Sequence, residues 1–151
     1  MGMTRVMCFG TFDGIHPGHA SYFSQAKELG DEVIVVVARD ATVVHVKGQL
    51  PFMNEDDRLR TVLSHPAVSH AQLGNHEDKY QVIVELKPDI LLLGYDQHVF
   101  TEKVKEVLAE RGVHVHVMRA KSYMPHVYKT SLLRTQSSPV VYEDDGDNLP
   151  L

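Results

Sequence analysis

Several features are scarce in this chain of 151 residues, and each scarcity excludes certain classes of protein. There is one cysteine, Cys8, so no internal disulfide can form, which suits a reducing cytoplasm. Cys8 lies in a short apolar run, where a cysteine acts as a small buried hydrophobe. No apolar run approaches the roughly 20 residues of a membrane-spanning helix. We therefore expect a cytoplasmic protein with no membrane partner.

Basic charge is also scarce. Fifteen Lys and Arg residues stand against 20 Asp and Glu, which gives a net charge of −5 with His neutral. Proteins that hold nucleic acid by its backbone are usually basic, so a nucleic-acid partner is not expected. A small anionic substrate stays compatible, because its site needs only a few local cations. Tryptophan is absent, and no aromatic-rich segment indicates a pocket for a large flat ring.

The hydrophobic pattern predicts strands and helices in alternation. Apolar runs predict strands over 5–9, 32–38, 68–73, 89–93 and 113–118. Helical spacing predicts helices over 17–29, after an N-cap at Asn54, over 78–86 and over 100–111, with a last one starting near Thr130. The polar stretch with Lys47, Gly48 and Pro51 is expected to be a loop. Strands that are apolar on both faces indicate a parallel α/β sheet with helices on both sides.

The chain is expected to form a single domain over residues 4–135. From Gln136 onward its character changes to an acidic, turn-rich segment. Such composition is typical of disorder, so residues 136–151 are interpreted as a disordered tail or the start of a linker. If the segment is a linker, the chain is one domain of a longer enzyme.

A glycine-rich block with two histidines follows the first strand. Residues 10–19 read Gly-Thr-Phe-Asp-Gly-Ile-His-Pro-Gly-His. Pro17 suits the first turn of a helix, whose N-terminus offers free N–H groups to a phosphate. His16 and His19 are three residues apart, so both can face an anion whose charge grows during a reaction. Metal ligation or a structural role are the alternatives, but no third ligand stands close in the sequence.

This block resembles the His-x-Gly-His signature of the nucleotidylyltransferase superfamily, in its cytidylyltransferase-like branch. Glycerol-3-phosphate cytidylyltransferases and archaeal-type FAD synthases belong to that branch. The resemblance covers roughly residues 4–135 and implies a Rossmann-like domain in which His16 and His19 contact the nucleotide phosphates. It also implies nucleotide contacts along the block, from Gly10, Thr11, Phe12, Asp13 and Gly18.

A second signature of that superfamily is resembled by residues 128–134, Tyr-Lys-Thr-Ser-Leu-Leu-Arg. Two hydroxyls at a helix start and a cation one turn later can bind the β- and γ-phosphates. The resemblance implies this role for Tyr128, Thr130, Ser131 and Arg134. Lys129 departs from the pattern, in which Ser is frequent. Taken alone, the segment is more typical of a plain capped helix, and its pairing with the first motif favours phosphate binding.

Further positions match the superfamily singly. The resemblance implies that Lys47 closes over the α-phosphate and that Arg119 contacts the triphosphate. Asp13 is expected to contact Mg²⁺ or another divalent cation, with turn capping as its alternative role. The resemblance places the nucleoside near a segment that follows a buried strand, at Gly94, Asp96 and Gln97. It also places two further residues near the nucleotide, Asp40 and Arg58.

The expected reaction is in-line displacement at the α-phosphorus by a phosphate or phosphonate oxygen of a small acceptor, with release of pyrophosphate. The first expectation is CMP transfer from CTP to a small phosphorylated or phosphonate-bearing alcohol. The alternative is FAD-synthase-like transfer of AMP from ATP to FMN, which the Gly-x-Asp-Gln form at 94–97 favours. A non-catalytic nucleotide sensor is the alternative of another class. The resemblance also allows a homodimer, and a fusion to a further catalytic domain through the tail.

Overall fold

The computed structural model describes residues 3–75, 78, 80–94 and 98–122, with the side chains of 98–102 left aside. Strands and helices alternate along this part of the chain. The strands are β1 (Arg5–Gly10), β2 (Glu32–Val37), β3 (His70–Leu73), β4 (Ile90–Leu93) and β5 (His116–Arg119). The helices are α1 (Pro17–Leu29), α2 (Asp40–Lys47), α3 (Glu55–Leu63), α4 (Gln81–Leu86) and α5 (His98–Glu110).

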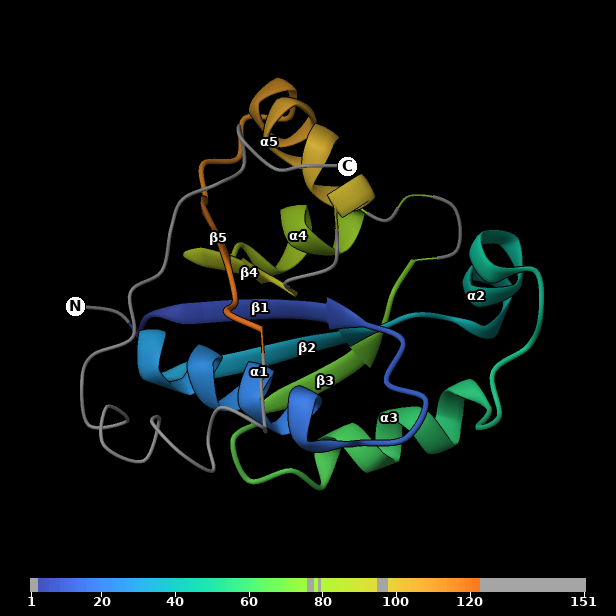
Figure 1. The fold of residues 1–151 in the computed structure, drawn as a ribbon. Helices are drawn as coiled ribbons and strands as arrows, with labels where there is room; N and C mark the ends of the chain where they lie inside the picture. The colour runs from blue at the N-terminus through green and yellow to red at the C-terminus, as the bar shows by residue number, and fades with distance from the viewer. Residues whose placement is uncertain (1–2, 76–77, 79, 95–97, 123–151) are drawn as a thin grey trace.

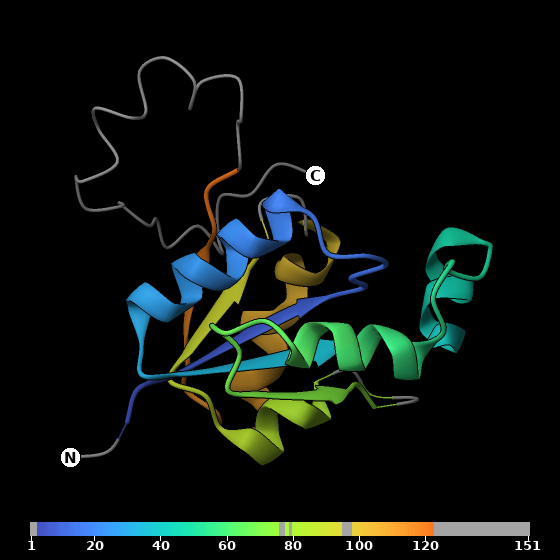
Figure 2. The same ribbon diagram turned by 90° about the horizontal axis from the view of Figure 1, so that it is seen from below.

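The strands form one parallel sheet in the order β3-β2-β1-β4-β5. Helices α1 and α3 cover one face of this sheet, and α4 and α5 cover the other (Figures 1 and 2). The expected Rossmann-like α/β architecture is therefore confirmed. The chain leaves β1 toward β2 on one side and reaches β4 on the other side. Ligands bind at such a switch point, beyond the carboxyl ends of the strands.

Burial on both faces explains why the strands are apolar throughout. Along β1, Val6 and Cys8 pack into the core under α1 and α3, whereas Met7 packs into the core under α4 and α5. The whole of Val33–Val37 is buried. Burial raises the pKa of the Cys8 thiol to about 12, against a smaller lowering by the Tyr22 hydroxyl. Cys8 is therefore an inert core residue, as its apolar surroundings indicated.

Helix α2 is absent from the sequence-based assignment. Only Val43 of this helix is buried, so it lacks the apolar stripe that reveals an amphipathic helix. Its end is set locally, because Gly48 adopts a left-handed φ of 83° and donates its N–H to the carbonyl of Val44. In Figure 1, α2 lies beyond the carboxyl ends of the strands. The expected loop begins only after Lys47.

Other boundaries shift by a few residues for local reasons. Strand β5 begins at His116 and not at Val113, because the N–H of Val113 still donates to Leu108 at the end of α5. Helix α4 begins at Gln81, since Asp78 instead accepts the N–H of Tyr80 in a turn. The expected N-cap is confirmed: Asn54 Oδ1 accepts from the N–H of Asp57 at 2.8 Å. The expected helix start near Thr130 and the tail over 136–151 lie outside the described residues.

Candidate nucleotide site

The candidate site residues that the structure describes gather at the carboxyl edge of the sheet. The histidine block follows β1, Asp40 and Lys47 belong to α2 beyond β2, Gly94 follows β4, and Arg119 ends β5. Because β2, β1, β4 and β5 are neighbours in the sheet, these groups share one edge. The edge includes the switch point between β1 and β4.

His16 is the N-cap of α1. Its Nδ1 accepts the N–H of Gly18 at 3.0 Å, and the Nδ1 of His19 accepts the N–H of His16 at 3.4 Å. Such a reciprocal pair is the capping-box arrangement, made here by two imidazoles. A neutral imidazole whose Nδ1 accepts carries its proton on Nε2. The Nδ1 atoms of both rings are thus turned toward the backbone at the start of α1.

The two imidazoles also stack on one another. Their ring centroids are 3.7 Å apart with an interplanar angle of 22°. The buried ring of Phe12 meets the His19 ring edge-on, with a centroid separation of 5.1 Å. The packing fixes the orientation of both imidazoles before any ligand arrives. A pair of oriented donors at a helix N-terminus is suited to a phosphate group.

Two glycines of the block make room for these rings. A Cβ on Gly18 would lie 2.9 Å from Cε1 of the His16 ring, and one on Gly10 would lie 2.6 Å from the Phe12 ring. Phe12 itself has a left-handed φ of 55°, which is rare for a bulky residue and is found at functional sites. Gly10 and Gly18 thus act by allowing the ring packing that positions the histidines.

Asp13 holds a loop that follows α2. Its Oδ2 accepts the N–H of Phe52 at 2.8 Å, and its Oδ1 accepts the N–H of Met53 at 2.9 Å. Desolvation acts to raise the pKa of Asp13, but these two N–H groups and the charges of Arg58 and Lys47 outweigh it. The pKa of Asp13 is therefore held below its ordinary value. The carboxylate stays ionised near neutral pH and ties the loop to the histidine block.

Arg58 lies at the centre of this arrangement. Its side chain is wholly buried, and it donates from Nε to the Met53 carbonyl, from Nη1 to the Thr11 carbonyl and from Nη2 to Asp40 Oδ1, at 2.7–2.9 Å. The salt bridge to Asp40 neutralises the buried charge. Arg58 thus joins the histidine block, the loop and α2 from inside the fold. In this structure it positions the site residues, while Asp40 supplies its counterion.

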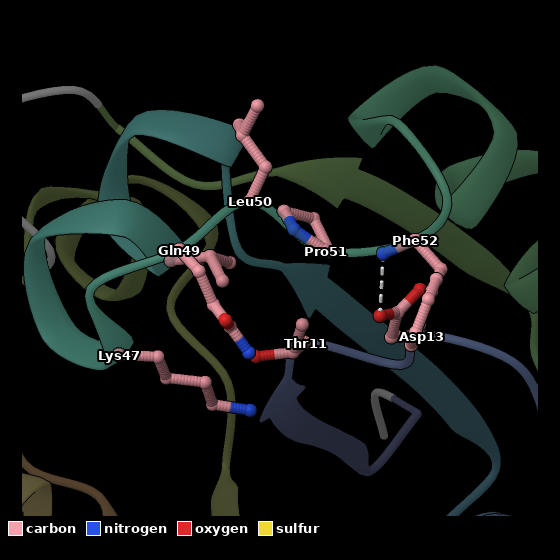
Figure 3. Close-up of a pocket in the computed structure, with 8 residues that line it drawn as sticks. Thr11, Asp13, Lys47, Gln49, Leu50, Pro51 and Phe52 are labelled. Atoms are coloured by element: carbon pink, nitrogen blue, oxygen red, sulfur yellow. Dashed lines mark hydrogen bonds between the residues drawn. The ribbon is translucent and has the colours of Figure 1, made fainter.

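Lys47 and Thr11 line a hollow beside this arrangement. The hollow has a volume of about 260 Å³, and Asp13, Gln49, Phe52 and other residues complete its lining. Figure 3 shows the loop of Gln49–Phe52 passing over Thr11, with the Asp13 carboxylate facing the N–H of Phe52. Ligand pockets usually have about 300–1,000 Å³, so this hollow suits part of a ligand. Lys47, at the end of α2, brings a cation to it.

The other side of the switch point is held together by Tyr22 and Arg119. The Tyr22 hydroxyl accepts the N–H of Phe9 at 3.1 Å and donates to the Leu92 carbonyl at 2.5 Å. It therefore bridges β1 and β4 where their pairing ends. Arg119 Nη1 donates to the Gly94 carbonyl at 2.5 Å. This contact holds the start of the segment that follows β4.

Part of the prediction lies outside the described residues, namely Asp96, Gln97, Tyr128, Thr130, Ser131 and Arg134. The sequence reasoning missed the roles of Phe52, Met53 and Tyr22. Tyr22 lies within the predicted helix over 17–29, and a helical pattern gives no sign of a hydroxyl between two strands. Among the described residues, no group of three or more His, Cys, Asp or Glu side chains could hold a metal ion. No described helix is both long and apolar enough to span a membrane.

Comparison with known proteins identifies the family. The Cytidylyltransferase-like family model matches residues 7–136. A protein of Methanoculleus marisnigri named FAD synthase is 41% identical over 91% of this chain and 94% of its own length. Another protein named FAD synthase, from Archaeoglobus profundus, is 47% identical over 80% of this chain and 76% of its own length. A solved structure titled as a lipopolysaccharide core biosynthesis protein of Thermoplasma volcanium matches with a TM-score of 0.77 at 39% identity, over 82% of this chain and all of that one.

These names correct the first expectation about the reaction. CMP transfer to a small phosphorylated alcohol is contradicted, since relatives at 38–47% identity over most of the chain are named FAD synthase. The error arose because the histidine block was interpreted as a phosphate-binding motif, and such a motif carries no information on the base. The likeness over the whole domain is more informative than the motif. The chain belongs to the cytidylyltransferase-like family and is a nucleotidyltransferase.

Proposed function

We propose that the protein is an FAD-synthase-like adenylyltransferase, which moves AMP from ATP to the phosphate of FMN and releases pyrophosphate. Relatives named FAD synthase support the choice of ATP and FMN, and the alignment covers up to 99% of a relative's length. The observation that carries the chemistry is the histidine pair at the start of α1. The two imidazoles stack on one another and cap the N-terminus of α1, where a phosphate is favoured.

The acceptor needs no activation. A phosphate monoester has a second pKa of about 6, so the FMN phosphate is already largely dianionic at neutral pH. One of its oxygens attacks the α-phosphorus of ATP, the bond between that phosphorus and the bridging oxygen breaks, and pyrophosphate leaves with the electron pair. Catalysis therefore consists of positioning and charge stabilisation, with no general base.

Each proposed catalytic residue has a distinct part in this reaction. His16 and His19 donate from Nε2 to the α- and β-phosphates as charge develops on them. Lys47 lies at the hollow and contributes a cation beside the α-phosphate. Arg119, at the end of β5, meets the leaving pyrophosphate. Tyr128, Thr130, Ser131 and Arg134 are assigned to the same pyrophosphate on the basis of the sequence signature alone.

A divalent cation is part of the proposal. Mg²⁺ prefers oxygen ligands and usually binds through one or two carboxylates together with phosphates of the substrate. Asp13 fits this chemistry: it is ionised, and each of its oxygens accepts a single N–H. Mg²⁺ bound there would neutralise phosphate charge, while Asp13 keeps the loop in place.

The test is pyrophosphate release with Mg²⁺ from ATP or CTP, each paired with FMN or glycerol 3-phosphate. The proposal predicts release with ATP and FMN well above every other pair. A preference for another acceptor by tenfold or more would contradict the FMN assignment. Absence of release from all pairs would contradict the enzyme proposed here.

A further inference from the structure

Phe52 is an aromatic side chain displayed entirely to solvent. Its relative exposure is 101%, and it is the only Phe or Tyr in the exposed class among residues whose side chains are described. Single exposed apolar residues are ordinary on a surface. Phe52 differs because of where it lies, since it lines the same hollow as Thr11, Asp13 and Lys47.

The backbone that carries Phe52 is held in place on both sides. The N–H groups of Phe52 and Met53 donate to the two oxygens of Asp13, and the Met53 carbonyl accepts from buried Arg58. Hydrogen bonds to ionised groups are the stronger kind. The backbone of Phe52 is therefore held in place although its ring is exposed to solvent. A ring held in this way can stack on a ligand at little entropic cost.

Resting on the proposed function, we propose that Phe52 is a specificity-determining residue on which the isoalloxazine ring of FMN stacks. The hollow holds the phosphate end of the acceptor near Lys47, and the flat ring extends outward over Phe52. Its volume of about 260 Å³ is too small for a whole FMN molecule, which agrees with a ring that leaves the hollow. A single aromatic face is sufficient, so no aromatic-rich segment is needed.

The sheet order separates this position from the nucleoside of ATP. The segment beginning at Gly94, which the family resemblance assigns to the nucleoside, follows β4. Phe52 follows α2, which leaves β2, and β1 lies between β2 and β4. The histidine pair follows β1, between the two. The proposed positions of the two rings thus lie on either side of the histidine pair, which is compatible with joining AMP to FMN through their phosphates.

The test compares Phe52→Ala with Phe52→Trp and with Leu63→Ala. Leu63 is also an exposed apolar residue, lies on α3 and does not line the hollow. Stacking of a base on an aromatic side chain is worth about 1–3 kcal/mol, or roughly five- to 150-fold in affinity. Phe52→Ala is expected to raise KM for FMN about tenfold with KM for ATP and kcat unchanged. Phe52→Trp and Leu63→Ala should stay within about twofold of the native enzyme.

Binding of FMN alone gives a second measurement. Stacking should quench flavin fluorescence, and the quenching should be lost in Phe52→Ala and kept in Phe52→Trp. A native enzyme that makes FAD while Phe52→Ala keeps its KM for FMN overturns this inference and leaves the proposed function standing. Equal increases in KM for ATP and FMN also overturn it, because they indicate a general disturbance of the loop. A native enzyme that makes no FAD from ATP and FMN overturns both.

Discussion

The N-termini of α1 and α3 are capped alike, but their first turns differ in charge. Each has a side-chain cap, His16 in α1 and Asn54 in α3. The first turn of α3 carries three carboxylates, whereas the first turn of α1 carries none. Carboxylates at a helix N-terminus satisfy its partial positive charge from within the protein. The first turn of α3 therefore stabilises its own helix, whereas the first turn of α1 has no carboxylate that would repel the proposed phosphate ligand.

The contacts around each helix support this difference. Glu55, in the first turn of α3, accepts the N–H of Asp40 at 2.8 Å and lies 3.7 Å from the Arg39 guanidinium. Arg58, one turn later, makes three further hydrogen bonds inside the protein. At α1 the capping groups are the imidazoles of His16 and His19, and no carboxylate takes part. The comparison predicts that changes near α3 affect stability and that changes at α1 affect turnover.

The largest effect is expected from Arg58→Met. The change leaves two carbonyls and Asp40 without their buried donor, and each loss of this kind costs about 1–3 kcal/mol. The free energy of unfolding should fall by about 3 kcal/mol or more, as measured by urea denaturation. Arg58→Lys keeps the charge but cannot make all three hydrogen bonds, so it should recover only part of the lost stability. A loss below about 1 kcal/mol would show that Arg58 does not hold this region together.

The next effect separates capping from catalysis at α1. Asparagine is a good N-cap but lacks the outward donor, so His16→Asn should keep stability within about 0.5 kcal/mol and lower kcat about 10²-fold or more. The matched variant Asn54→Ala removes the cap of α3 and should cost about 1 kcal/mol of stability with turnover unchanged. Near-normal turnover in both His16→Asn and His19→Ala would remove the histidines from the mechanism.

A smaller effect is expected when α1 is made to resemble α3. Ala20→Glu places a carboxylate near the start of α1 without altering the cap. An added charge at a helix terminus is worth about 0.3–1 kcal/mol, so KM for ATP should rise about two- to fivefold while the melting temperature is kept or slightly raised. Ala20→Gln is the uncharged control. An unchanged KM in Ala20→Glu would argue that the α1 N-terminus does not meet the triphosphate.

The smallest effect concerns Asp13 and pH. Its pKa is lowered in the folded state, so its contribution to stability is present above the unfolded pKa of about 3.9 and is lost as pH falls through the folded pKa. Asp13→Asn should therefore be less stable than the native protein at pH 7, and the difference should shrink below about pH 4. Urea midpoints measured from pH 7 to pH 2.5 test this. A difference that is constant across that range would contradict the ionised clamp.

The sequence predicted well what depends on burial and on local motifs. The five strands, the cap at Asn54 and the helix after the histidine block follow from apolar runs and capping residues, and the structure confirms them. Helix α2 was missed because only Val43 is buried in it, so no periodicity could reveal it. Among the candidate site residues, His16 and Asp13 were proposed from the motif, and their roles stay predictions. Their contacts, above all the tie from Asp13 to Phe52 and Met53, join distant segments and need the fold.

The nucleotide base predicted from the sequence, cytosine, was also wrong, and the reason is chemical. Triphosphate binding needs N–H groups, imidazoles and cations, which leave a recognisable block in the sequence. Selection of adenine over cytosine depends on pocket shape, which no short motif records. The scarcity of aromatic residues argued against a flavin, whereas the proposal above needs only one exposed ring, that of Phe52.

A competition experiment tests the central claim most directly. The native protein is given equimolar ATP and CTP together with FMN and Mg²⁺, and the dinucleotide products are identified by mass spectrometry. The account predicts FAD as the dominant product, with pyrophosphate formed in equal amount. A cytidine-containing flavin dinucleotide as the main product would contradict the choice of nucleotide. Absence of any flavin dinucleotide, while the protein still binds ATP, would contradict the proposed reaction.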